Sequence, residues 1–197
     1  MANTTASANG GMGTMQGGVT VTPAGPETLQ ALTQIGVRVV VPEAGDVARL
    51  LSGVGVHFKV DGNATGGAFE VVEHPLDPGA FAWPHTHSHE DECSYVLEGE
   101  LGVLLGERTI TAGPGTWVFK PRGLTHAFWN AGPGRVRFLE IISPAGFGNF
   151  FRELAALAQA KNGQPDGRQM DALASKYGLA FHMERAPAIQ EAFGLPA

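Results

Sequence analysis

Three kinds of residue or segment are scarce in the sequence, and each scarcity excludes a class of protein. Cys93 is the single cysteine among 197 residues, so neither an internal disulfide nor a cysteine-rich metal site can form. Only 16% of the residues are charged, and 19 aspartates and glutamates outnumber 13 lysines and arginines. The net charge of −6 is unsuited to neutralising a phosphate backbone or an anionic membrane, so we expect no nucleic acid or membrane partner.

Long hydrophobic runs are also missing. No run approaches the roughly 18 apolar residues of a membrane-spanning helix. Residues 1–26 contain no charged side chain and are rich in small polar residues, which predicts a flexible N-terminal tail. This segment lacks the basic start and the continuous apolar stretch of a secretory signal. We therefore expect a cytoplasmic location.

Glycine and proline are abundant instead, with 28 and 13 residues, and they separate short runs of alternating hydrophobic residues. A short helix is expected at 27–34, before the first run. Many short strands at close spacing favour an all-β sandwich or barrel over βαβ units. The expected strands are Val37–Val41, Gly55–Val60, Gly67–Glu73, Cys93–Leu97, Leu101–Leu105, Thr109–Thr111, Thr116–Lys120, Thr125–Trp129 and Val136–Ile142.

The pattern becomes helical after Ser143 and Pro144. Large apolar residues recur at helical spacing on one face: Phe147, Phe150, Phe151, Leu154 and Leu157. They could line a ligand site, but we favour a helix that closes the open side of the barrel. With further helices expected at 168–177 and 187–193, and a loop at Gly163–Gly167, we predict a barrel at 27–145 and a helical extension packed on it at 146–197.

Two segments carry the chemistry. His85 and His87 are two residues apart, so a strand places both imidazoles on one face. The polar residues that follow can form a turn, after which Glu92 begins the next strand and can face the same interior. In the second segment, His126 follows a tight turn and could bring a third imidazole from a neighbouring strand. Imidazoles and a carboxylate together are a typical ligand set for a first-row divalent metal.

These residues resemble the two motifs of the cupin superfamily. Gly79-x5-His85-x-His87-x4-Glu92-x6-Gly99 has the form of the first motif, and Gly115-x5-Pro121-x-Gly123-x2-His126-x3-Asn130 has the form of the second. The 15 residues between Gly99 and Gly115 suit a compact single barrel. The segment after Ser143 is similar to that of bacterial quercetin-dioxygenase-like cupins.

The resemblance implies a double-stranded β-helix, a jelly-roll barrel that holds one divalent transition metal (Mn, Fe, Ni, Cu, Co or Zn). The metal ligands would be His85, His87, Glu92 and His126. We predict a dioxygenase that acts on a small chelating substrate of the enol, diketone or flavonol type, with O2 as co-substrate and Glu92 as catalytic base. The alternatives are a non-redox isomerase, cyclase or lyase, or a binding module without turnover. The resemblance also predicts a homodimer.

Other residues near the motifs have plainer interpretations. His89 could be an alternative or outer ligand, but a polar turn residue is the simpler interpretation. We expect structural roles for His57, His74 and His182, and a core position for Cys93, which has the opposite strand parity to Glu92. Phe128 has the strand parity to line a pocket. Trp83 and Trp129 could line the pocket or lie in the core, and the sequence favours neither position.

Overall fold

The computed structural model describes residues 13–15, 19–21, 25–34, 37–41, 45–50, 53–160 and 165–196. The chain divides into two compact units, Met1–Val41 and Pro42–Ala197. The first holds a hairpin of β1 (Gly13–Met15) and β2 (Val19–Val21), and then α1 (Pro26–Gln34). The hairpin falls in the segment predicted as a tail, most of which lies outside the described residues, and the predicted helix at 27–34 is confirmed.

The predicted strand Val37–Val41 is wrong, because these residues have no regular secondary structure. Val37 and Val39 are 41% and 42% exposed, and no described strand pairs with them. A β-branched run forms a strand only where a neighbouring strand takes up its backbone N–H and C=O groups. The β propensity of Val37–Val41 is therefore insufficient to form a strand without a neighbouring strand to pair with.

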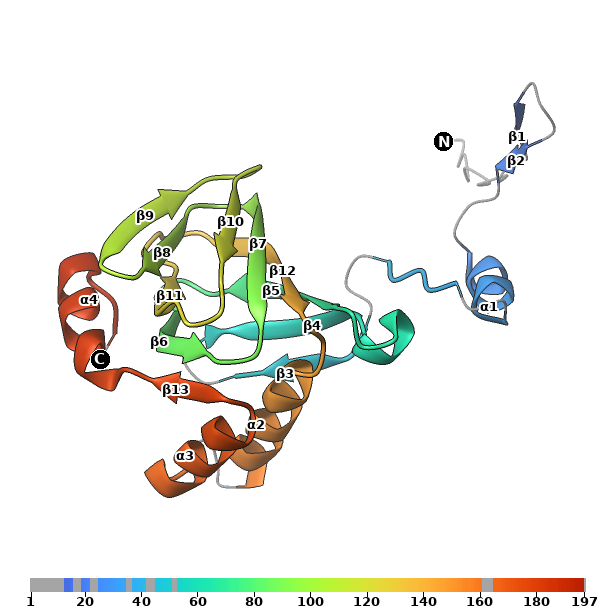
Figure 1. Cartoon of the computed structure of the whole chain (residues 1–197). Coiled ribbons are helices and arrows are strands. Elements are labelled where there is room, and N and C mark those ends of the chain that lie inside the picture. Colours follow the sequence, from blue (N-terminus) through green and yellow to red (C-terminus); the bar gives the residue numbers. More distant parts are fainter. Residues whose placement is uncertain are drawn as a thin grey trace, which may run out of the picture. The chain divides into compact units, whose positions relative to one another are not determined.

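The second unit contains two antiparallel sheets that face each other (Figure 1). One sheet has the order β10 (Trp117–Lys120), β7 (Asp91–Glu98), β12 (Val136–Ser143), β5 (Glu70–Leu76), β4 (Gly55–Val60) and β3 (Val47–Arg49). The other has the order β13 (Leu179–Phe181), β6 (Phe81–His87), β11 (His126–Trp129), β8 (Leu101–Leu105) and β9 (Arg108–Ala112). This all-β arrangement is the predicted double-stranded β-helix.

Alternation along the strands places the core between the sheets. On β12 the buried residues are the even-numbered ones, beginning with Val136 and Phe138, and on β7 they are Glu92, Ser94 and Val96. These two strands pair side by side, so their buried faces form one continuous interior wall. Most of that wall is apolar, and its polar members gather near Glu92.

The chain after β12 covers the barrel with helices, as predicted. α2 (Gly148–Ala160) buries Phe150, Phe151 and Leu154 against residues of β4, β5 and β12. α3 (Gly167–Lys176) follows, and a single turn at Met183–Arg185 leads into α4 (Ala186–Phe193), which packs on Trp129 and its neighbours. Of the predicted loop at Gly163–Gly167, residues 163–164 lie outside the described residues, 165–166 have no regular secondary structure, and Gly167 begins α3. Figure 1 shows α2 beside β3, and α4 beside the five-stranded sheet.

The positions of other strands also differ from the prediction. β5 begins at Glu70 and ends at Leu76, three residues later than expected at both ends. β3 and β13 were not expected. Each has only three residues, and each is held in its sheet by pairing with one neighbouring strand, β4 for β3 and β6 for β13. Such short strands exist through their pairing and leave too few positions for a period to be recognised.

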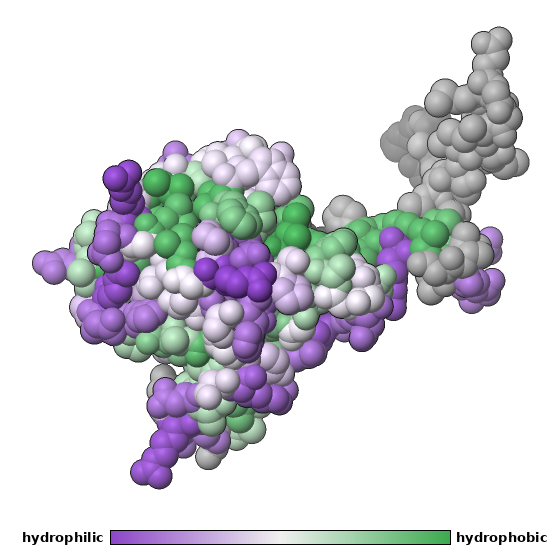
Figure 2. All heavy atoms as spheres, viewed as in Figure 1, coloured by the Kyte–Doolittle hydropathy of each residue, from purple (hydrophilic) through white to green (hydrophobic). Residues whose placement is uncertain are grey.

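The visible face of the molecule mixes hydrophilic and hydrophobic residues (Figure 2). Large apolar side chains that remain exposed include Leu97, Ile110, Trp117 and Phe119, on β7, β9 and β10. Within the described residues, no helix is long and apolar enough to cross a membrane.

Candidate metal centre

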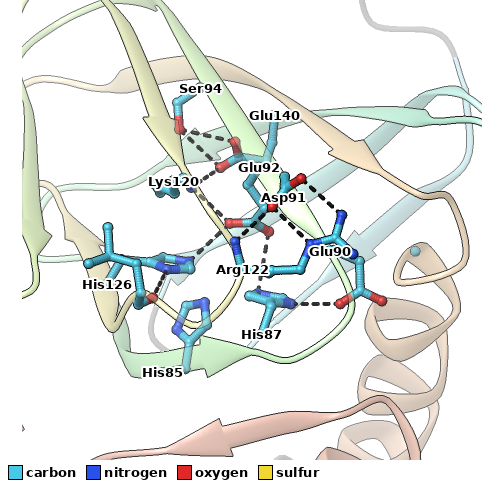
Figure 3. Close-up of polar contacts among 12 residues, drawn as sticks. His85, His87, Glu90, Asp91, Glu92, Ser94, Lys120, Arg122, His126 and Glu140 are labelled. Carbon is cyan, nitrogen blue, oxygen red and sulfur yellow. Dashed lines mark hydrogen bonds and ion pairs between the residues drawn. The ribbon is translucent and has the colours of Figure 1, made fainter.

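The four predicted ligands converge inside the barrel (Figure 3). His85, His87, Glu92 and His126 each offer a ligand atom, and these atoms all lie within 4.8 Å of one another. The imidazole centroids are 4.3 Å apart for His85 and His126, and 5.1 Å apart for His85 and His87. His87, Glu92 and His126 are buried, and His85 is half-buried. The cluster could therefore hold one metal ion that is reached from the side of His85.

Strand register explains how distant residues meet. β6 carries both His85 and His87, and β11 pairs with it so that His126 lies directly opposite His85. Glu92 comes from β7 in the other sheet, after the turn at 88–90. The turn resets the strand parity, so the odd spacing between His87 and Glu92 does not prevent both from facing the interior. The site thus bridges the two sheets.

The two turns next to the ligands are joined to each other. The N–H of Gly123, which has φ of +80°, donates to the carbonyl oxygen of His87 at 2.8 Å. Asp91 accepts from the backbone N–H of Arg122 at 2.8 Å, and from its guanidinium at 3.1 and 2.9 Å. These bonds hold the end of β6 and the start of β7 against the turn that leads to His126.

Hydrogen bonds fix which nitrogen of each imidazole faces the cluster. Nδ1 of His85 donates to the carbonyl of Trp83 at 2.6 Å, and Nδ1 of His126 donates to that of Leu124 at 3.0 Å. Nδ1 of His87 lies 3.3 Å from the Glu90 carboxylate, which is also buried. Because carbonyl oxygens only accept, Nδ1 carries the proton and Nε2 keeps its lone pair. Outer partners of this kind typically orient metal-binding histidines.

The Nε2 atoms supply the test of whether a metal fits. Among the described residues, Nε2 of His87 and of His126 are the buried side-chain atoms that have no hydrogen-bond partner. They lie 3.4 and 3.0 Å from the two oxygens of Glu92. A buried polar atom without a partner costs free energy, which a bound cation would recover. Three neutral imidazoles and one carboxylate are a donor set that suits a first-row divalent ion.

The electrostatics agree with this donor set. Burial lowers the pKa of His85 well below its usual value, and it also lowers the pKa of His126. Both rings are therefore neutral and able to donate a lone pair near neutral pH. Burial works against the charge of Glu92, but the Lys120 ammonium, 2.9 Å away, holds the pKa of Glu92 well below its usual range. His85 and His126 thus offer neutral nitrogen donors beside one ionised carboxylate.

A cavity of about 100 Å³ adjoins the cluster, and His85 and Glu92 form part of its wall. Most of the wall is apolar, with aromatic side chains from the barrel and from the chain after β12. The remaining polar members are His74 and Glu140. The other lining residues are Leu50, Val54, Phe81, Ala82, Trp83, Phe128, Phe147, Phe150, Phe151, Leu154, Met170, Leu179 and Phe181.

The apolar residues predicted to share one helix face at 147–157 therefore have both of the roles considered for them, which are packing in the core and lining a ligand site. Phe150, Phe151 and Leu154 are buried in the core, and they also line the cavity. Phe147 touches the metal cluster itself, with its ring centroid 4.3 Å from that of His87. The preference for a purely packing role was thus too narrow, because α2 closes the barrel directly over the candidate site.

The other residues considered near the motifs lie outside the four-residue cluster. His89 is exposed in the turn, and Cys93 is half-buried with a thiol whose pKa burial raises. Trp129 lies in the core against Phe193. His57 lies half-buried on β4.

His182 and His74 differ from each other. Nε2 of His182 lies 2.8 Å from Oγ1 of Thr86, which is the expected structural role. His74 lines the cavity, which sequence reasoning missed because this residue lies outside both motifs.

Sequence reasoning also missed three buried polar residues behind Glu92, namely Ser94, Lys120 and Glu140 (Figure 3). A signal for Lys120 did exist. On β10 the exposed residues are Trp117 and Phe119, while Val118 and Lys120 are buried. A lysine that shares strand parity with a core valine is a sign of a buried charge.

The comparisons with known proteins agree with this fold. A sequence model of the Cupin domain family matches residues 72–142, which include all four candidate ligands. No curated protein matches the chain significantly. Among solved structures, a predicted oxalate decarboxylase from Thermotoga maritima is 23% identical with a TM-score of 0.51, covering 54% of this chain and 98% of its own.

Two further structures are similar. KdgF from Halomonas sp. is 20% identical with a TM-score of 0.50, covering 56% of this chain and 97% of its own. The polyketide cyclase RemF from Streptomyces resistomycificus is 31% identical with a TM-score of 0.48, covering 54% of this chain and 79% of its own. With both motifs complete, the family model matched and the two-sheet barrel in place, the chain belongs to the cupin superfamily and carries a single cupin domain.

Proposed function

We propose that the protein is a mononuclear metal-dependent dioxygenase that acts on a compact, chelating enol or diketone. The single observation that carries the proposal is the apolar cavity beside an imidazole and carboxylate cluster in which Nε2 of His87 and of His126 lack partners. A redox-active divalent ion bound by His85, His87, Glu92 and His126 would supply Lewis acidity and electron exchange with O2.

The size and lining of the cavity narrow the substrate class. A dry apolar cavity of about 150 Å³ holds benzene, so a cavity of about 100 Å³ would be filled completely by even a small enol or diketone. A flavonol, with three rings, would require aromatic residues of α2 or β13 to move. The wall offers few polar groups to a sugar or a dicarboxylate, so an apolar substrate with one chelating end fits best.

The proposed roles of this chain's residues follow from their positions. The aromatic wall would exclude water and hold the apolar part of the substrate, which orients its oxygens toward His85 and Glu92. Glu92 is the proposed catalytic base, since an ionised carboxylate at the cavity can accept the enol proton. The Lys120 ammonium keeps Glu92 ionised and so free to accept a proton, and it also lowers the basicity of that carboxylate.

Oxygen uptake tests the proposal. Metal-free protein would be loaded anaerobically with Mn, Fe, Co, Ni or Cu, and then given O2 with 2,4-pentanedione, a cyclic 1,2-diketone or 3-hydroxyflavone. We expect uptake that matches substrate loss with at least one redox-active metal, fastest for the compact substrates. The zinc-loaded protein is the control and should consume no O2. Absence of uptake with every metal would exclude the dioxygenase.

One observation supports a non-redox reaction as the alternative function. His74 and Glu140 line the cavity without being candidate ligands, and either could move a proton in an isomerase, cyclase or lyase. Loss of substrate at an equal rate without O2 would select this alternative. Thermal stabilisation by a compound that is recovered unchanged would instead select a binding module.

The predicted homodimer is proposed on the exposed edge of the six-stranded sheet. β10 is the edge strand, and its Trp117 and Phe119 are 58% and 60% exposed. Unpaired edges with apolar side chains favour association with another chain. Size-exclusion chromatography with light scattering should return twice the 20.6 kDa chain mass, and Phe119→Glu should shift it toward the single-chain mass. A single-chain mass for the unmodified protein would contradict this expectation.

A further inference from the structure

A buried polar network lies directly behind the candidate ligand Glu92. Nζ of Lys120 is 2.9 Å from Oε2 of Glu92 and 2.5 Å from Oε2 of Glu140. Oγ of Ser94 donates to the Glu140 carboxylate, with 3.1 Å to each oxygen. All four residues are 4% exposed or less. We call Ser94, Lys120 and Glu140 the Lys120 network.

Strand register builds this network from three adjacent strands. Lys120 on β10 is the cross-strand partner of Glu92 on β7, and Glu140 on β12 is the partner of Ser94 on β7. Directly opposed residues on one sheet face lie close enough for their side chains to meet. The ammonium therefore lies between two carboxylates that neighbouring strands hold in place (Figure 3).

Stability alone gives no reason for this arrangement. A buried ion pair loses so much hydration that apolar residues of similar volume often stabilise a fold at least as well. The surrounding wall is largely apolar, with Val96, Val118 and Phe138 nearby in the core cluster. A role connected with Glu92 explains why charges occupy this position.

We propose that Lys120 is a positioning residue, which holds the Glu92 carboxylate turned toward His87 and His126 before a metal ion arrives. Glu140 and Ser94 in turn hold Lys120. The inference rests on the proposed metal site. Its geometric support is that the Glu92 oxygen bonded to Lys120 is also the one 3.0 Å from Nε2 of His126, while the other is 3.4 Å from Nε2 of His87. Outer partners that orient a ligand typically contribute about 10–100-fold to metal affinity.

Charge and orientation must be separated in the test, because a nearby ammonium also repels a cation. Burial raises the pKa of Glu140 to about 7, so above that pH Lys120→Met with Glu140→Gln removes one positive and one negative charge, and the net charge around Glu92 is unchanged. The double variant leaves position 140 neutral, and Glu92 keeps its own charge without the Lys120 partner. The matched control is Lys176→Met with Glu153→Gln, which deletes an exposed pair at 2.7 Å, far along the chain from the ligands.

The measurement is the affinity for Zn²⁺ and Co²⁺, determined by competition with a chromophoric chelator. We expect the Lys120→Met/Glu140→Gln variant to bind each ion at least about tenfold more weakly than the unmodified protein, and the control variant to be unchanged. The visible spectrum of the Co²⁺ form should also change, because it reports the ligand arrangement. Ser94→Ala loosens Glu140 alone and should lower affinity by roughly threefold.

The outcomes are distinct. Unchanged affinity and an unchanged Co²⁺ spectrum in the folded double variant would overturn the positioning role. If that variant does not fold, unchanged affinity in Ser94→Ala would overturn it. Metal binding by the unmodified protein without O2 uptake would overturn the dioxygenase and leave the positioning role standing, whereas no metal binding at all would remove the metal site and this inference with it.

Discussion

Replacing His126 with alanine is expected to lower the affinity for a divalent metal by at least about a hundredfold. His126 is the only candidate ligand from the second motif, and its buried Nε2 has no hydrogen-bond partner to replace a cation. Loss of a direct ligand should exceed the effect of losing an outer partner, which is about 10–100-fold. Chelator competition with Zn²⁺, and metal analysis of the purified variant, measure the change.

The control for this prediction is His57→Ala. His57 lies half-buried on β4 and is absent from the cluster, so this variant should bind metal as the unmodified protein does. Loss of the His126 ring could also disturb the barrel, so circular dichroism must show that the variant is folded. A folded His126→Ala protein with full metal content and unchanged affinity would contradict the four-residue site.

The barrel was predictable because turn residues separate its short strands and because strands such as β7 and β12 alternate between buried and less buried side chains. The boundaries of Gly55–Val60 and Leu101–Leu105 were predicted to the residue, since glycines and turn residues delimit both runs. β5 was placed too early because Gly67 and its neighbours look extended, whereas the structure has a turn of helix at Gly62–Thr65 and pairing that begins at Glu70. Pairing with β12 decides where β5 starts, and the sequence around residues 67–70 carries no information about that pairing.

The convergence of the four candidate ligands was predictable for a different reason. Their residue types are those that a divalent ion prefers, and two tight turns set their spacing, so both signals are local. The walls of the cavity were not predictable in the same way. Leu179 and Phe181 reach the site only because β13 pairs with β6, and α2 reaches it only because the barrel is open at that end. Such contacts depend on the assembled fold.

Lys120 shows the same limit within a motif. Its parity with Val118 indicated a buried side chain, but its two carboxylate partners depend on the register of three strands. Glu140 lies 20 residues further along the chain, with nothing local to distinguish it from an exposed glutamate. Buried networks of this kind become visible once cross-strand pairs are known.

The second large effect is expected from His74, whose burial should make stability fall steeply with acidification. The ring lies among Phe128, Phe138 and Phe151, with centroids 5.0–5.6 Å apart, and Nδ1 donates to the carbonyl of Gly55 at 2.9 Å. Burial lowers the pKa of His74 from 6.5 to about 4. Between these values the unfolded chain binds a proton that the folded chain refuses, so the stability present above pH 6.5 is lost as the pH falls toward 4.

His74→Phe should remove this dependence, because phenylalanine fills an aromatic surrounding without titrating. Urea unfolding of the metal-free proteins between pH 7 and 4 would measure it. The unmodified protein should lose about 3 kcal/mol more free energy of unfolding than the variant over this window. Other titrating groups, including His85 and His126, are present in both proteins, so their contributions to the pH dependence cancel in the difference between the two free energies of unfolding. Phe193→Leu, a neutral change in the separate cluster around Trp129, should lower stability equally at every pH. A pH dependence that survives His74→Phe unchanged would mean that His74 takes up its proton in the folded state, through contacts that its aromatic neighbours do not provide.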